Sequence, residues 1–137
     1  MTKDTSSTGF QNRREFFRVK FNTPLRFTAC SASAPKDRIA EGASQNVSQS
    51  GILFRAVGDP PPMSSIVWMD VDLRTLKICQ EIEARALVTH NGLLGRVVRV
   101  EEDPKNNASY DVGVCFLTHD QKDTQEVQKA LAELSAR

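Results

Sequence analysis

The sequence has too few cysteines, too widely spaced, for a disulfide framework or a structural metal site. Its three cysteines are far apart, with no two at the spacing of a metal-binding pair: Cys30, Cys79 and Cys115. Such isolated cysteines are typical of small buried hydrophobic side chains in a reducing cytosol. We therefore predict that they are buried and that neither a disulfide nor a metal holds the fold together.

Long apolar runs are also missing. No stretch approaches the ~20 apolar residues that a membrane-spanning helix needs. Residues 1–12 lack the apolar core of a secretion signal. We expect a cytoplasmic protein that does not insert into membranes.

A basic excess is absent as well, because 18 lysines and arginines are matched by 17 acidic residues. General binding to a polyanion needs a broad positive surface, and binding of single strands also needs aromatic platforms for base stacking. The sequence has one tryptophan. A single-strand-binding barrel is thus the weakest of the binding hypotheses, and we expect neither DNA nor RNA as a partner.

Motifs of catalysis and metal binding are lacking too. The three cysteines have no sequence-adjacent catalytic partner, and no G-x-S-x-G, phosphate-loop or H-E-x-x-H pattern occurs. Asp70 and Asp72 form an Asp-x-Asp pair, but strand alternation places them on an exposed polar face. His90 and His119 have no second ligand at metal spacing, which favours two surface residues. We expect no catalytic residue, no metal and no cofactor.

What the sequence does contain is one domain's worth of chain, 137 residues, with a polar start. Residues 1–12 bury too little apolar surface to offset chain entropy, so we predict a flexible tail there. The domain follows over residues 13–137. It comprises an arginine segment at 13–18, a barrel over about 19–117 and a helix over about 120–135.

Alternating apolar residues predict the strands. The predicted strands are Val19–Ala29, broken at Pro24, Ile52–Val57, Ile66–Leu73, Ile82–Val88, Leu93–Glu101 and Tyr110–Phe116, with a weaker one at Arg38–Gln45. Asn91-Gly92 predicts a hairpin turn. Val98 and Val100 are expected on one face of the returning strand, and residues 102–109 predict a loop.

After Phe116 the apolar period becomes helical, with Asp120 and Asp123 resembling a capped start. Six or seven short antiparallel strands and one terminal helix describe an all-β protein, a small closed barrel with a helix laid across it. Closure removes exposed strand edges, which a sheet of this size needs. Trp68 is expected to be half covered by the helix.

The most unusual stretch is Arg13-Arg14-Glu15-Phe16-Phe17-Arg18. Arginine binds phosphate and the O6/N7 edge of guanine through a planar fork. Arg14 and Arg18 are four residues apart and can face the same side of the segment. Arg13 would face the opposite side of an extended segment and could stack on a base. The alternative interpretation is an ordinary solvated basic turn.

A second unusual stretch is Asn46-Val47-Ser48-Gln49-Ser50-Gly51. On a strand end, Asn46 and Ser48 project to one face, where asparagine can bind a guanine edge and serine a phosphate. Gly51 either has a positive φ or lets a ligand approach the backbone. Taken alone, the stretch is explained by an ordinary turn. Together, the two stretches predict a site for a guanine-bearing anion.

These motifs resemble those of the PilZ domain, the bacterial receptor module for cyclic di-GMP. The R-x-x-x-R signature reads Arg14-Glu-Phe-Phe-Arg18, and the [D/N]-x-S-x-x-G signature reads Asn46-Val-Ser48-Gln-Ser-Gly51. The C-terminal part is also similar, with Gly95-Arg-Val-Val-Arg-Val, then Tyr110-Asp-Val-Gly-Val-Cys-Phe116 and a helix. The resemblance covers about residues 11–134.

The resemblance implies a six-stranded antiparallel barrel of the PilZ type with a C-terminal α-helix. It implies that Arg14 and Arg18 bind the phosphates and guanine Hoogsteen edges of cyclic di-GMP. It further implies that Asn46 and Ser48 hydrogen-bond guanine and phosphate, and that Gly51 keeps the turn open.

Arg13 occupies a place where, in the family this chain resembles, an arginine accompanies an intercalated ligand dimer. The resemblance therefore implies two stacked ligands per domain. The preferred hypothesis is a non-enzymatic sensor or adaptor, monomer or homodimer, that changes conformation on binding cyclic di-GMP. It would signal through contact with a downstream protein, in motility or biofilm regulation. The alternative is a PilZ-fold interaction adaptor that does not bind the nucleotide.

Overall fold

The computed structural model describes residues 19–20, 22–30, 39–74 and 78–135. The predicted tail (1–12) and the arginine segment (13–18) lie outside the described residues.

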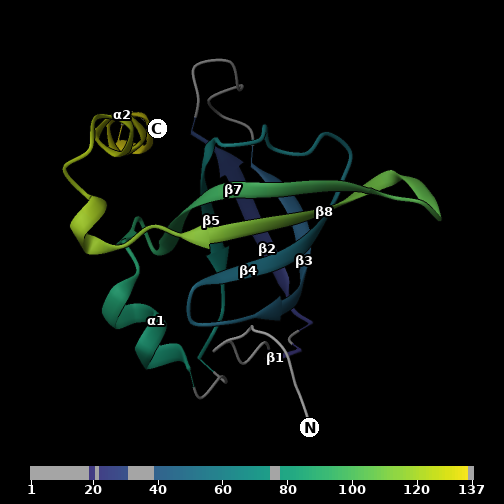
Figure 1. The fold of residues 1–137 in the computed structure, drawn as a ribbon, viewed down its shortest axis with the longest axis horizontal. Coiled ribbons are helices and arrows are strands. Elements are labelled where there is room, and N and C mark those ends of the chain that lie inside the picture. Colours follow the sequence, from purple (N-terminus) through teal and green to yellow (C-terminus); the bar gives the residue numbers. More distant parts are fainter. Residues whose placement is uncertain (1–18, 21, 31–38, 75–77, 136–137) are drawn as a thin grey trace, which may run out of the picture.

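Six antiparallel strands close into a barrel (Figure 1). They are β2 (Pro24–Ala29), β3 (Ala40–Val47), β4 (Gly51–Val57), β5 (Ile66–Val71), β7 (Gly92–Asp103) and β8 (Asn106–Phe116). Neighbours follow the order β3-β2-β5-β7-β8-β4, and β4 pairs back with β3. Two short strands lie outside this ring, β1 (Val19–Lys20) on β3 and β6 (Val88–Thr89) on β7. The predicted all-β closed barrel with a terminal helix is confirmed.

The barrel interior is filled by alternate residues of its strands. Ile52, Phe54 and Ala56 of β4 are all buried, as their alternation predicted. The Phe54 ring lies 4.9 Å from that of Phe27 on β2, centroid to centroid. Removing this apolar surface from water is the main term that stabilises the barrel, at about 25 cal/mol per Å². Outward residues of the same strands are thereby left free to form a binding surface.

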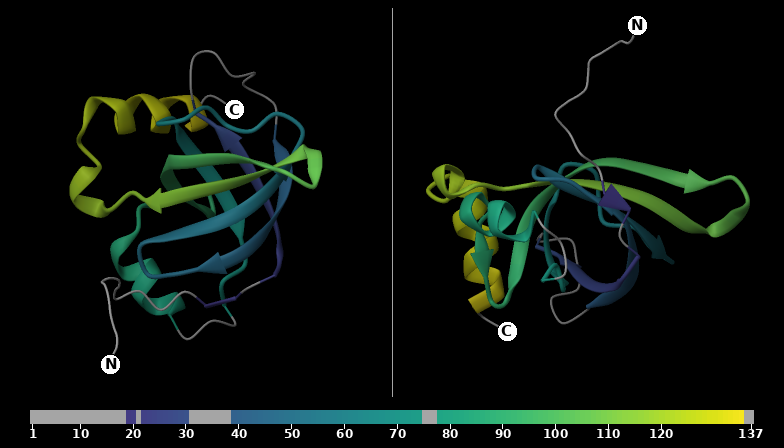
Figure 2. Two further views of the ribbon diagram at one scale, coloured as in Figure 1. Left: turned by 45° about the vertical axis from the view of Figure 1, so that its right-hand side comes forward. Right: turned by 90° about the horizontal axis from the view of Figure 1, so that it is seen from below.

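A second apolar cluster lies between the barrel and helix α2 (Gln125–Ser135), which runs along the outside of the barrel (Figure 2). Trp68 of β5 packs in this cluster with Val127 and Leu134 of α2 and is 7% exposed. The helix therefore covers Trp68 more completely than expected. The Trp68 indole N–H donates to the Thr89 carbonyl at 3.1 Å, so its polar atom is satisfied.

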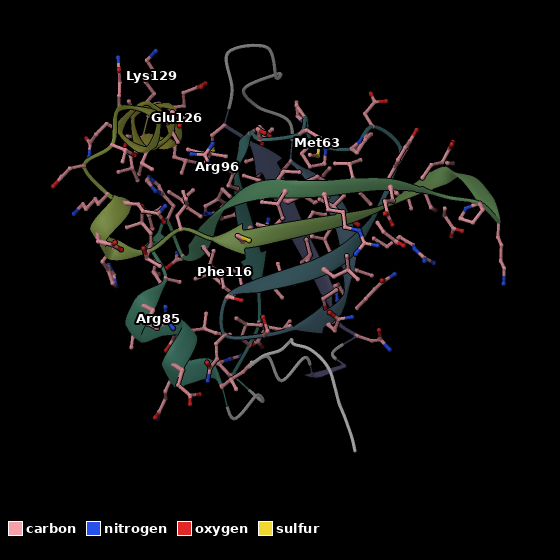
Figure 3. The ribbon with its side chains drawn as sticks, viewed as in Figure 1. Met63, Arg85, Arg96, Phe116, Glu126 and Lys129 are labelled. Carbon is pink, nitrogen blue, oxygen red and sulfur yellow. The ribbon has the colours of Figure 1, made fainter. Side chains whose placement is uncertain are left out.

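An ion pair also ties α2 to the barrel. The Arg96 guanidinium on β7 donates to both carboxylate oxygens of Glu126 at 3.0 and 3.2 Å (Figure 3). The helix begins later than predicted because its capping oxygen belongs to Thr124, which accepts the Val127 N–H at 3.4 Å. A 3-10 turn (His119–Gln121) occupies the predicted start instead.

The predicted strand at Ile82–Val88 is wrong, because most of this segment forms helix α1 (Cys79–Arg85). Ile82 and Ala86 are both buried, and residues four apart lie on one face of a helix as readily as residues two apart lie on one face of a strand. Glu81 in the first turn and Arg85 in the last suit the helix dipole. Within the described residues, neither α-helix is long and apolar enough to cross a membrane.

Two predictions about turns also need correction. The hairpin turn after β6 consists of His90 and Asn91, both with positive φ, one residue earlier than the predicted Asn91-Gly92 pair. The predicted loop at 102–109 is mostly strand, because β7 continues to Asp103 and β8 begins at Asn106. The resulting long hairpin extends beyond the barrel (Figure 1).

The prediction that the three cysteines are buried is wrong. Cys115 is exposed, and Cys30 and Cys79 are half-buried. Cys115 lies between Val114 and Phe116, which both point into the core, so the pleat of β8 turns its thiol outward.

A β-bulge separates Val98 and Val100, which were predicted to share one face. Val97 pairs with Val114 and Arg99 pairs with Gly113, so Val98 is an extra residue in β7. Val98 is 48% exposed, whereas Val100 packs against the core. The bulge therefore shifts the alternation by one residue and turns Arg99 to the outer face.

Candidate ligand-binding site

A hollow of about 130 Å³ lies on the outer face of the barrel, beside the turn between β3 and β4. Asn46, Ser48 and Gly51, the three residues predicted from the second stretch, all line it. Asn46 is half-buried on the outer face of β3, opposite in direction to the buried Val47, whereas Ser48 follows the end of β3 and is only 8% exposed. The described part of the predicted site therefore forms one surface.

One row of paired residues crosses four neighbouring strands through this hollow. Asn46 of β3 is opposite Leu53 of β4, which is opposite Gly113 of β8, which is opposite Arg99 of β7. Strands are spaced by roughly 4.8 Å, so the row is about 14 Å long between its end residues. A polar amide thus stands at one end, an arginine at the other, and a bare glycine between them.

A bulge on β3 gives Asn46 its outward direction. Ser44 pairs with Phe54 and Asn46 pairs with Leu53, so Gln45 is the extra residue. Ser44 is buried, and strict alternation would have buried Asn46 as well. Because bulges re-aim the side chains that follow them, the Asn46 amide lies on the outer face instead.

The Ser48 hydroxyl is held within the turn that joins β3 to β4. The Ser48 N–H donates to the Gly51 carbonyl at 2.9 Å and closes the turn. The Ser48 hydroxyl oxygen accepts the Ser50 N–H at 3.3 Å and lies 3.3 Å from the Ser50 hydroxyl. A hydroxyl with fixed neighbours is pre-organised, so little rotamer freedom would be lost when it meets a ligand.

Gly51 is required by the packing of the barrel itself. It is not among the described residues with positive φ, so the first of its two predicted roles does not apply. A Cβ atom built on Gly51 would come within 2.3 Å of the Val114 carbonyl oxygen on β8, which is backbone and cannot easily move. Close approach of two strands therefore explains this glycine.

We expect Gly51→Ala to lower the free energy of unfolding by about 1–3 kcal/mol, the usual cost of forcing extra atoms into a packed site. Chemical denaturation of the variant and the wild type measures this difference. An unchanged unfolding midpoint would show that β4 and β8 do not approach as closely as described.

Gly113 differs from Gly51 because no backbone crowds it. A Cβ atom at Gly113 would meet only the Arg99 side chain, with Arg99 Cβ at 3.2 Å and Cδ at 3.8 Å. The missing side chain leaves room in the middle of the row, next to the Arg99 side chain. A flat ring can lie in this space, which a larger residue would fill.

Arg99 is the functional candidate that the sequence did not reveal. It lines the hollow, and its guanidinium Nη2 donates to the Glu101 carboxylate at 2.6 Å. This hydrogen bond raises the pKa of Arg99 and lowers the pKa of Glu101. Strict alternation would have placed Arg99 inside the barrel beside Val97. The bulge at Val98 turns Arg99 outward instead, and a bulge is defined only by the pairing of two strands.

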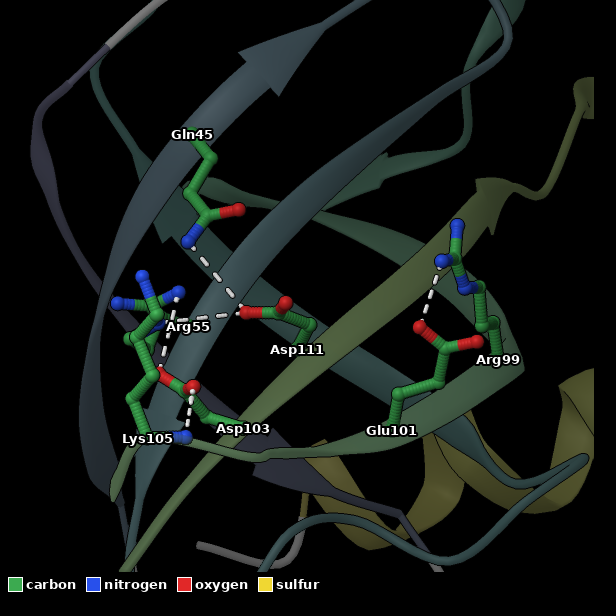
Figure 4. Close-up of polar contacts among 7 residues, drawn as sticks. All are labelled: Gln45, Arg55, Arg99, Glu101, Asp103, Lys105 and Asp111. Atoms are coloured by element: carbon green, nitrogen blue, oxygen red, sulfur yellow. Dashed lines mark hydrogen bonds and ion pairs between the residues drawn. The ribbon is translucent and has the colours of Figure 1, made fainter.

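Arg55 of β4 forms ion pairs with acidic residues of the long β7–β8 hairpin (Figure 4). The Arg55 guanidinium lies 3.3 Å from the Asp111 carboxylate and 3.5 Å from that of Asp103. Asp111 is opposite both Arg55 and Glu101 in the strand pairing, so the row of these three residues lies next to the Asn46–Arg99 row. Negative charge on β7 and β8 is therefore close to the arginine that faces the hollow.

A family model for the PilZ domain matches residues 12–133, almost the whole chain. The chain belongs to the PilZ domain family. No protein with a curated description matches the sequence.

Two solved structures are similar to this PilZ domain at low identity. The Bacillus subtilis inhibitor of motility (MotI/DgrA) has a TM-score of 0.48 and 12% identity, over 93% of this chain and 54% of that one. The K. pneumonia MrkH–c-di-GMP complex has a TM-score of 0.47 and 11% identity, over 92% and 54%. The chain thus spans about half the length of each.

Of the two PilZ signatures, only the second lies within the described residues. Asn46, Ser48 and Gly51 of the second signature line the hollow. Arg13, Arg14 and Arg18 lie outside the described residues. Lys20 of β1, two residues after Arg18, is opposite Asn46 in the pairing of β1 with β3. Val19 and Lys20, the first described residues, therefore lie beside the end of β3 that carries Asn46.

The other polar candidates in this PilZ domain have local partners or lie on the surface. Asp70 is paired with Arg26, and Asp72 accepts from Arg74 at 2.8 and 2.9 Å, which lowers the pKa of Asp72 to about 2. His90 and His119 are exposed, and His90 Nδ1 lies 2.8 Å from the Thr89 hydroxyl. Over the described ranges, no three potential metal ligands cluster.

Proposed function

We propose that this PilZ domain is a receptor for cyclic di-GMP. The observation that carries the proposal is that Asn46 and Ser48 stand over one hollow whose floor, at Gly113, has no side chain. Such a surface offers an amide for a guanine edge, a hydroxyl for a phosphate, and space for a flat base.

The hollow is small for a whole nucleotide. Ligand pockets are typically about 300–1,000 Å³, and this one measures about 130 Å³. One base or phosphate would therefore sit in the hollow, while the arginine segment covers the rest of the ligand. In this proposal Arg14 and Arg18 bind phosphates and guanine Hoogsteen edges, and Arg13 favours two stacked ligands.

The output of the receptor, in this proposal, is a change in the surface offered to a downstream protein. A ligand that binds only when the arginine segment closes on the barrel shifts the population towards that closed state. The shift is limited by the difference in affinity between the two states. No catalytic step is needed for this function.

Cys115 provides a probe of the site, because it is exposed and lines the hollow. We expect calorimetric titration with cyclic di-GMP to give a measurable affinity and about two ligands per domain. Saturating ligand should slow maleimide labelling of Cys115 at least fivefold, as read by mass spectrometry. Cys79 serves as the internal reference, since partial burial and the nearby Glu83 and Asp72 raise the pKa of its thiol.

Heat of binding with no protection of Cys115 would place the ligand elsewhere on the domain. Absence of both heat and thermal shift would favour the alternative, an interaction adaptor that does not bind the nucleotide. A bound ligand at 100 times its Kd would stabilise the folded state by about 2.7 kcal/mol and would be detected.

A further inference from the structure

Arg99 and Glu101 form an ion pair on the rim of the proposed cyclic di-GMP site. Both residues are on the outer face of β7, two positions apart, and their side chains are each about half exposed. The aliphatic part of Arg99 lies beside Gly113, and Arg99 is among the residues that line the hollow. Arg99 is therefore the positively charged group among the described residues that line the site.

The barrel fixes the backbone position of Arg99, so that only the rotamer of its side chain is free to vary. Arg99 is at the opposite end of the row that begins at Asn46, with Leu53 and Gly113 between them. A ligand lying across this row would contact the Asn46 amide at one end and the Arg99 guanidinium at the other. A planar fork of N–H donors suits a phosphate or the O6/N7 edge of guanine.

Glu101 uses part of the hydrogen-bonding capacity of Arg99. A single contact is made, from Arg99 Nη2 to Glu101 Oε1 at 2.6 Å, and a guanidinium has five N–H donors. Glu101 itself is opposite Asp111 in the strand pairing, so two carboxylates are neighbours on this part of the sheet. Their negative charge opposes an anion that approaches Arg99.

We propose that Arg99 binds the anionic ligand from the β7 side of the hollow, and that Glu101 is a built-in counter-anion that competes with the ligand for Arg99. This proposal rests on the proposed function of the site. A phosphodiester and a carboxylate each carry one negative charge and accept the same N–H groups. The ligand must therefore displace Glu101 or share Arg99 with it, and either event lowers the affinity of the unmodified domain.

Two substitutions have opposite expected effects on the Kd for cyclic di-GMP, measured by calorimetry on the full chain. Arg99→Ala removes the fork and should weaken binding about tenfold. Glu101→Gln keeps an oxygen that can accept from Arg99 but removes the charge. It should tighten binding about two- to fivefold, because exposed ion pairs are individually weak. The gain should shrink at 0.5 M salt, where exposed charges are largely screened.

A double variant tests whether Glu101 acts through Arg99. In an Arg99→Ala background, Glu101→Gln should change the Kd less than twofold, since the competition no longer exists. Asp70→Asn is the matched control, because it breaks the exposed Arg26–Asp70 pair on β2 and β5. That pair is outside the hollow, so the control should leave the Kd unchanged.

The outcomes separate this proposal from the proposed function. Binding by the wild type with an unchanged Kd for Arg99→Ala would overturn the role of Arg99. Weaker binding by Glu101→Gln would show that Glu101 supports Arg99 and does not compete with the ligand. If neither the wild type nor Glu101→Gln binds the nucleotide, the receptor function itself fails.

Discussion

Substituting either arginine of the first signature should weaken cyclic di-GMP binding at least tenfold. Arg14→Ala and Arg18→Ala each remove charge-assisted hydrogen bonds to phosphate or guanine, worth about 1.5–3 kcal/mol. Each 1.4 kcal/mol corresponds to about a factor of ten in Kd. Calorimetric titration of each single variant measures the loss, and the double variant should bind more weakly than either.

Arg26→Ala is the matched control for these variants. Arg26 is an exposed arginine of β2 whose partner is Asp70, outside the hollow. The control should bind with unchanged affinity, because only a general loss of positive charge would affect it. Unchanged affinity in both Arg14→Ala and Arg18→Ala would refute the assignment of the arginine segment to the ligand.

A side chain added at Gly113 should block the site while leaving the fold intact. Gly113→Val fills the space between Leu53 and Arg99, where the proposal places a flat base. We expect the affinity for cyclic di-GMP to fall at least tenfold. The free energy of unfolding should change by less than about 1 kcal/mol, because the added Cβ meets no backbone atom, its nearest neighbour is Arg99 Cβ at 3.2 Å, and glycine is itself unfavourable in a strand.

The comparison with two other variants makes this test specific. Ala108→Val enlarges an exposed residue on the same strand, outside the hollow, and should alter neither stability nor binding. Gly51→Ala should instead destabilise the barrel, since its neighbour is the Val114 backbone. If Gly113→Val binds as tightly as the wild type, the ligand does not lie on this floor.

Much of the fold follows from local alternation. Ile52, Phe54 and Ala56 repeat with period two and are buried in β4, because burying one face of a pleated strand excludes the most apolar surface from water. The helical segment at Ile82 was mispredicted because a short apolar pattern fits both periods. Its helix is decided by the packing of Ile82 against the barrel core.

The candidate site also contains residues that the sequence predicted and residues that it did not. Asn46, Ser48 and Gly51 could be named from one short stretch, since residues close in sequence stay close in a turn. Arg99 and Gly113 could not be named. They meet Asn46 only because β3, β4, β8 and β7 are consecutive in the barrel, and this order does not follow the order of the chain.

The sequence by itself thus determined most of the strands, the terminal helix and the two signatures, because each depends on spacing within a short stretch. Only the tertiary structure decided which residues share the hollow. Two bulges, at Gln45 and Val98, turn Asn46 and Arg99 to the outer face. A bulge is defined by the pairing of two strands, and that pairing is fixed by contacts between residues far apart in the chain.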